Sequence, residues 1–135
     1  MPFDPANLVF SREHEWVARD DADPNTATVG ITDYAQGELG DVVYVDLPTV
    51  GAAVKQFETF GEVESVKSVS DLFSPVSGTV AEVNSGLEDK PELVNEDPYG
   101  EGWMLRVTIE DERELQSLLS HDEYQAFLTE LSGGD

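Results

Sequence analysis

Short runs of apolar residues, many of them alternating with polar ones, fill the chain from about residue 10 to residue 109 and predict a succession of β-strands. Gly, Pro, Asp and Asn interrupt these runs every few residues, as is typical of turns. Short strands with frequent turns are typical of a small barrel or sandwich. Strands are expected at about 10–17, 26–31, 41–47, 54–66 and 103–109, and strand-like residues at 72–83 are interrupted by Pro75 and Gly78. The first two strands are expected to form a peripheral hairpin around a turn at 20–25.

A helical pattern is expected at residues 33–39, where Thr32 or Asp33 can cap the first turn and Gly40 can end the last one. Gln36 follows Asp33 at the spacing of a capping box. One further helical turn fits residues 86–91. Both segments are short, so the expected fold class remains mainly β.

The C-terminal segment, about residues 111–132, predicts two short amphipathic helices instead of strands. Asp111 with Glu114, and Ser120 with Glu123, have the spacing of capping boxes. The two apolar faces would carry Leu115, Leu118 and Leu119, then Tyr124, Phe127, Leu128 and Leu131, and Gly133-Gly134 would end the second helix.

Residues 1–135 are expected to form a single domain, with a β core at about 10–109 followed by this helical segment. The 39% hydrophobic content is enough for one modest core. The aromatic residues expected in that core are Trp16, Tyr44, Phe57, Phe60, Phe73 and Trp103.

The charge balance is strongly acidic, with 29 Asp and Glu against 7 Lys and Arg, a formal net charge of −22. Nucleic acids and anionic membrane surfaces are therefore excluded as expected partners, because both are polyanions. The carboxylates are spread among apolar residues, which indicates a folded domain with an acidic coat. A salt-rich cytoplasm screens the repulsion within such a coat, so we expect a halophilic source.

Several kinds of chemistry have no support in the sequence. The chain has no Cys, and His14 and His121 are its only imidazoles, so no metal site is expected and both histidines are assigned to surface or capping positions. A nucleophile elbow and a phosphate-binding loop are absent, which argues against a hydrolase or a kinase. No segment has the pattern of a membrane span, signal peptide or transit peptide, so a cytoplasmic location is expected.

Lys67 is the candidate functional residue. It is one of only three lysines among 135 residues, and it lies between two strand-patterned stretches, where a hairpin tip is expected. Surface lysines usually serve solubility, but Asp and Glu fill that role here, and Lys55 and Lys90 are the only other lysines. An amine at a hairpin tip is accessible to another enzyme.

Several short motifs follow one another along nearly the whole chain, namely Glu13–Val17, Val29–Gln36, Leu39–Val45, Gly61–Asp71, Pro75–Gly78, Asn84, Pro91–Asn95 and Asp97–Trp103. No single motif is specific, but the combination is. Their order and spacing resemble the H protein of the glycine cleavage system, a family of lipoyl carriers.

The resemblance implies a flattened β barrel-sandwich hybrid of the lipoyl and biotinyl type, with short helices and the lipoyl lysine at a hairpin tip. Lys67 would carry lipoate on its side-chain amine. Glu64 matches the acidic residue that the family presents to the lipoylating enzyme. Gly51 and Gly78 match the glycines found 16 residues before and 11 residues after the lysine of lipoylated domains. Both are expected at turns that require positive φ. Ser68 stands where Ala is commoner.

The resemblance also implies a swinging-arm carrier and not an enzyme. Lipoamide on Lys67 would take the aminomethyl group of glycine from glycine decarboxylase, the P protein, to aminomethyltransferase, the T protein. Dihydrolipoyl dehydrogenase, the L protein, would then accept the electrons. A cofactor of this kind explains how a chain without Cys can carry out sulfur chemistry.

Three other kinds of protein compete with this one. A lipoyl domain of a 2-oxo acid dehydrogenase usually has Asp immediately before the lysine, where this chain has Val66. Biotin carriers usually have Met on both sides, where this chain has Val66 and Ser68. A non-carrier interaction protein stays open on the sequence alone.

Overall fold

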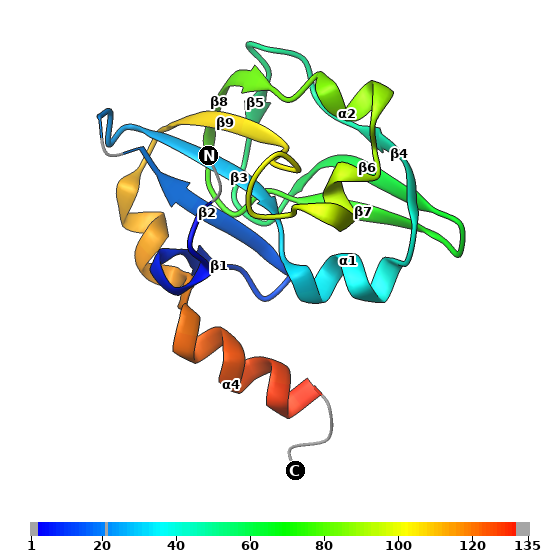
Figure 1. Ribbon diagram of the computed structural model, residues 1–135. Coiled ribbons are helices and arrows are strands. Elements are labelled where there is room, and N and C mark those ends of the chain that lie inside the picture. The colour runs from blue at the N-terminus through cyan, green and yellow to red at the C-terminus, as the bar shows by residue number, and fades with distance from the viewer. Residues whose placement is uncertain (1–2, 21, 132–135) are drawn as a thin grey trace.

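The computed structural model describes residues 3–20 and 22–131, which form two antiparallel sheets with short helices around them (Figure 1). The strands are β1 (Val9–Phe10), β2 (Glu15–Arg19), β3 (Thr26–Ile31), β4 (Val42–Asp46), β5 (Ala53–Val54), β6 (Thr59–Ser65), β7 (Val69–Phe73), β8 (Gly78–Val83), β9 (Leu105–Ile109) and β10 (Leu119–Ser120). The larger sheet has the order β10-β1-β2-β3-β9-β8-β5, and the smaller one has the order β4-β6-β7.

The helices are η1 (Pro5–Asn7), α1 (Asp33–Leu39), α2 (Gly86–Asp89), α3 (Leu93–Glu96), η2 (Glu112–Ser117) and α4 (His121–Leu131), where η marks a 3₁₀ helix. In Figure 1 the β6–β7 hairpin forms the right-hand edge of the molecule above α1, and α4 lies at the lower left. Among the described residues, no helix has the length and apolar character needed to cross a membrane.

The main core lies between the two sheets, because strands of both contribute buried side chains to one cluster. Val29 of β3 and Val107 of β9 come from the larger sheet, and Val63 of β6 and Leu72 of β7 come from the smaller one. Each is at most 2% exposed, as expected for alternating strand positions that face a core.

A second, smaller cluster fills the other side of β1 and β2, beneath α4. It joins Phe10 and Trp16, both fully buried, to Tyr124 of α4. Strand β2 is consequently buried on both faces, with Val17 in the main core and Trp16 in the second cluster. The expected β2–β3 hairpin exists, but the expectation that it is peripheral was wrong, because α4 and the N-terminal segment cover its outer face.

Two expected strands are each divided in the structure. The expected strand 10–17 is broken by a turn in which His14 adopts φ 73°, and the expected strand 54–66 is broken near Phe57, which adopts φ 66°. Such left-handed backbone usually requires Gly, so the residue types gave no signal of either corner. Two aromatic residues expected in the core are instead about half exposed: Phe57 at its corner, at 48%, and Tyr44 beside a β-bulge, at 50%.

The helix expected at residues 33–39 is confirmed as α1. Thr32 is the N-cap, because its Oγ1 accepts a hydrogen bond from the Ala35 amide, and Gly40 ends the helix with φ 77°. Gln36 does not close a capping box, since its amide donates to the Asp33 carboxylate instead.

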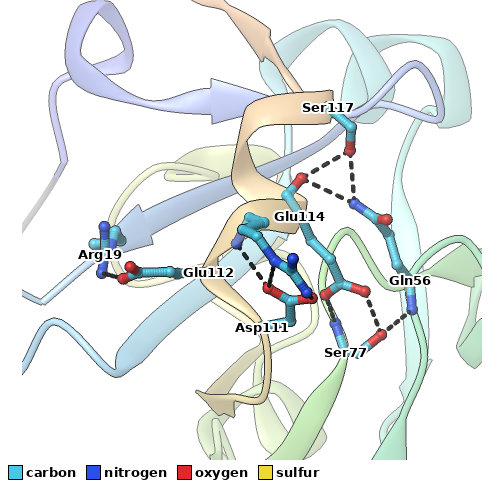
Figure 2. Close-up of polar contacts among 8 residues, drawn as sticks. Arg19, Gln56, Ser77, Asp111, Glu112, Glu114 and Ser117 are labelled. Carbon is cyan, nitrogen blue, oxygen red and sulfur yellow. Dashed lines mark hydrogen bonds and ion pairs between the residues drawn. The ribbon is translucent and has the colours of Figure 1, made fainter.

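The C-terminal segment is only partly the pair of helices expected. Ser120 and Glu123 form the expected capping box, with side-chain to backbone distances of 2.8 and 3.2 Å. The first helix is a 3₁₀ helix, and its expected capping box at Asp111 does not form. The Glu114 carboxylate instead accepts bonds from the Ser77 amide and hydroxyl, both at 2.7 Å (Figure 2).

Residues after this 3₁₀ helix return to extended backbone. Leu119 and Ser120 form β10 and pair with β1, so the segment 111–132 contributes an edge strand to the larger sheet as well as helices. Gly133-Gly134, expected to end α4, lies outside the described residues.

Candidate functional site

Lys67 is exposed at the tip of the β6–β7 hairpin, as the sequence predicts. Ser65 shapes this tip. Its amide donates to the Ser68 carbonyl at 2.8 Å, and its hydroxyl accepts from the amides of Lys67 and Ser68 at 3.3 and 3.2 Å. A serine side chain that caps its own turn explains how the tip forms without Gly or Pro.

The turn between α1 and β4 supports the tip from outside the hairpin. The Val66 amide donates to the Asp41 carbonyl at 3.1 Å. The Lys67 side chain also passes close to Gly40, because a Cβ added there would lie 3.1 Å from Lys67 Cε. Gly40 therefore leaves room for the lysine stem as well as ending α1.

Sequence reasoning did not assign these roles to Ser65 or Gly40. A Ser two residues before the exposed lysine is a weak signal of a side-chain-capped turn. The contact between Gly40 and Lys67 joins positions 27 residues apart, and the sequence carried no signal for it.

The Lys67 amine is free in an acidic setting. Over the described residues, Lys67 has no ion pair, whereas Lys55 pairs with Glu110 at 3.7 Å. Glu64 lies near the end of β6, half-buried, opposite Tyr44 of β4 and Val69 of β7. The structure thus brings Glu64 and Lys67 together on one hairpin.

The structure places the other two candidate residues away from this hairpin, on the β5–β8 side of the larger sheet. Gly51 has φ 93°, and its amide donates to the Val80 carbonyl at 2.8 Å. Gly78 begins β8 and pairs with Val54. The expectation that both glycines need positive φ was wrong for Gly78. Its lack of a side chain is required because a Cβ would lie 2.0 Å from the Thr108 carbonyl oxygen.

A cavity of about 420 Å³ lies beside α1 and β7, the elements next to Lys67. Its walls include Tyr34 and Glu38 of α1 and Asp71 of β7, together with Glu13 and Glu15. Carboxyl groups on several sides make the cavity better suited to a cation than to an anion.

Glu15 is the buried acid of this cavity, at 2% exposure. The Ser11 hydroxyl donates to its Oε1 at 2.7 Å and the Phe73 amide donates to its Oε2 at 3.2 Å. Burial raises the pKa of the Glu15 carboxyl to about 8, and these two hydrogen bonds only partly offset that shift.

His14 lies on the cavity wall, half-buried and not simply on the surface as expected. Its Nδ1 is 2.8 Å from the Tyr124 hydroxyl, and its ring packs against Tyr34 at 4.8 Å between centroids. Burial lowers the pKa of the His14 imidazole. Among the described residues, no group of three His, Asp or Glu side chains is arranged to hold a metal ion.

An exposed amine without an ion pair, on a tip that projects from the body, fits covalent attachment of a carboxylic acid cofactor through an amide. The end of the Lys67 side chain lies beside Gly40 while the residue stays exposed. By contrast, Lys55 has an ion-pair partner in Glu110.

Comparisons with known proteins agree with this geometry. Residues 8–131 match the family model described as glycine cleavage H-protein. The glycine cleavage system H protein of Rubrobacter xylanophilus is 60% identical over 126 residues, covering 93% of this chain and 95% of that protein. The one from Staphylococcus haemolyticus is 53% identical over 126 residues, covering 93% and 98%.

A solved structure is similar as well. The crystal structure of a glycine cleavage system H protein from Mycobacterium marinum has a TM-score of 0.80 and 41% sequence identity. The match covers 91% of this chain and 97% of that one. The expected fold class, a mainly β barrel-sandwich with short helices, is thereby confirmed.

Proposed function

The chain belongs to the glycine cleavage H-protein family, the lipoyl carriers of the glycine cleavage system, and we propose that Lys67 is its site of lipoate attachment. The observation that carries this proposal is the free, exposed amine at the tip of the β6–β7 hairpin. Membership of the family also decides against a lipoyl domain of a 2-oxo acid dehydrogenase.

In this proposal, the residues near the tip and the two more distant glycines have different roles. Ser65 holds the backbone of the turn, and Gly40 leaves space for the lysine stem. Glu64, on the same hairpin, gives the lipoylating enzyme an acidic contact. Gly51 and Gly78 act less directly: Gly51 adopts a φ of 93° that a side chain would strain, and Gly78 leaves room for the close approach of the Thr108 carbonyl of β9.

Lipoate joined through an amide to Lys67 Nζ supplies a dithiolane, the group that can carry a one-carbon fragment and electrons. The chain contributes the tether and the surfaces around it. Catalysis would reside in its partners, namely glycine decarboxylase, aminomethyltransferase and dihydrolipoyl dehydrogenase, together with the lipoylating enzyme. The tether raises the effective concentration of the carried group at each of them. We place this cycle in the cytoplasm.

The test is peptide mass mapping of protein isolated from its native cells, combined with lipoylation in vitro by a purified lipoate-attaching enzyme. Wild type should gain one lipoyl group on Lys67, and Lys67→Arg should gain none, because a guanidinium is a poor acyl acceptor at neutral pH. The matched control changes both other lysines, as Lys55→Arg with Lys90→Arg, and should be modified like wild type. Lipoate found on Lys55 or Lys90 with Lys67 free would overturn the assignment.

A further inference from the structure

Asn95 uses its whole side chain to hold the turn between α1 and β4. Its Oδ1 accepts from the Val42 amide at 2.9 Å, and its Nδ2 donates to the Gly40 carbonyl at 2.8 Å and to Gln36 Oε1 at 3.0 Å. Asn95 belongs to the short helix α3, which follows the larger part of the β core in the sequence. A single amide group thus links α3 to the end of α1 and to the first residue of β4.

The turn that Asn95 holds is the one that supports Lys67. Gly40 and Val42, the two backbone partners of Asn95, flank Asp41, whose carbonyl accepts the Val66 amide at 3.1 Å. Gly40 also lies against the Lys67 stem. Asn95 is therefore connected to Lys67 in two ways. One runs through the backbone, from the turn that Asn95 holds to Val66, and the other runs through Gly40 to the Lys67 side chain.

We propose that Asn95 is a positioning residue for the lipoylation of Lys67, which rests on the proposed function of that lysine. Asn95 fixes the carbonyl of Gly40 and the amide of Val42, and so keeps Asp41 where it can hold Val66. Without that support the hairpin tip tilts, and the amine spends less time in the orientation that an acylating enzyme can use. An acyl transfer needs the amine aligned with the acyl carbon, so a smaller competent fraction weakens apparent binding of the acceptor.

Asn84 offers a matched control, because it makes the same set of bonds at another place. It is also half-buried, its Nδ2 donates to the carbonyls of Glu101 and Trp103 at 2.8 and 2.7 Å, and its Oδ1 accepts from the Gly86 amide at 3.2 Å. None of these partners is Gly40, Asp41 or Val66. Asn84→Ala therefore removes the same number of donated and accepted hydrogen bonds as Asn95→Ala, but leaves the contacts that support Lys67 in place.

The experiment compares Asn95→Ala with Asn84→Ala at a temperature where circular dichroism shows both to be folded. Hydrogen exchange followed by NMR should be faster at the Val66 amide in Asn95→Ala and unchanged there in Asn84→Ala. In lipoylation by the purified enzyme, Asn95→Ala should raise KM roughly tenfold with little change in kcat, because only the competent fraction of the acceptor falls. Asn84→Ala should have the KM of wild type.

A second pair of variants, Asn95→Asp and Asn84→Asp, keeps the shape of the side chain and the accepting oxygen but loses the donated hydrogen bonds. This pair replaces the alanine variants if either of those fails to fold. Equal KM values for the Asn95 and Asn84 variants, or an unchanged Val66 exchange rate, would overturn the positioning role. Mapping wild-type protein separates the two proposals, since lipoate on another residue would overturn the role of Lys67 itself.

Discussion

At the scale of the residue, Glu15 is a buried acid whose ionisation is unfavourable in the folded protein. Its carboxyl lies under β7 with two hydrogen bonds, and burial holds its pKa at about 8, compared with 4.5 for the exposed group. Between these two pH values the folded chain binds a proton that the unfolded chain has released. The contribution of Glu15 to the free energy of unfolding is therefore fully present at low pH and is lost as the pH rises toward 8.

This gives a prediction about pH. The free energy of unfolding of wild type should fall from about pH 5 to about pH 8 relative to Glu15→Gln, which cannot ionise, and the difference should level off at higher pH. Urea denaturation of both proteins at a series of pH values measures this difference in free energy. Parallel curves for wild type and Glu15→Gln across this range would show that Glu15 is ionised in the folded protein.

At the scale of the element, α4 is attached to the β core mainly through Tyr124. The Tyr124 ring stacks on Phe10 with centroids 4.6 Å apart, and its hydroxyl lies 2.7 Å from Thr32 Oγ1 and 2.8 Å from His14 Nδ1. Thr32 is also the N-cap of α1. One hydroxyl therefore joins α4 both to the start of α1 and to the turn before β2.

Tyr124→Phe should keep the stacking and lose these hydrogen bonds, lowering the free energy of unfolding by about 1–3 kcal/mol because buried partners are left unsatisfied. Tyr44→Phe is the control, since Tyr44 is 50% exposed and removal of its hydroxyl should change stability little. Urea denaturation of both variants measures the effect. A Tyr124→Phe variant as stable as wild type would mean that water replaces the lost hydroxyl.

The elements also show what sequence alone could predict. The helix α1, the hairpin at Lys67 and the capping box of α4 follow from local residue types, and all three were predicted. The corners at His14 and Phe57, and the 3₁₀ form of η2, depend on tertiary contacts such as that of Glu114 with Ser77. Motifs made Lys67 the candidate residue, whereas the contacts of Gly40 and Asn95 join distant segments and could not be predicted from local patterns.

At the scale of the whole molecule, the excess of acidic side chains is the main electrostatic influence on stability. The formal net charge is −22. Ion pairs within residues 3–20 and 22–131 already engage four of the seven Lys and Arg side chains, namely Arg19, Lys55, Arg106 and Arg113. Most of the 29 carboxyl groups therefore have no cation to balance them. Their mutual repulsion opposes the compact state and is weakened by salt.

We expect the melting temperature to rise as KCl is increased to the molar range, where the Debye length falls to about 3 Å. The origin of the chain in a salt-rich cytoplasm stays a prediction that this measurement addresses. Calorimetry measures the melting temperature in KCl and in sucrose of equal osmolarity. A rise in KCl that sucrose does not reproduce comes from screening of the charges and not from a general solute effect. A melting temperature that is flat or falling in KCl would count against the halophilic assignment.

The two edge strands of the larger sheet, β5 and β10, are only two residues long. An edge strand exposes unpaired backbone groups on which another chain can build, and shortness is one way in which proteins prevent this. In the smaller sheet, edge strand β4 is interrupted by a bulge between Val42 and Tyr44. Of the four edge strands in the described part of the chain, only β7 (Val69–Phe73) thus presents a longer continuous edge. A carrier that meets several enzymes in turn therefore offers few places for pairing with copies of itself, which should favour its remaining dispersed when it is abundant.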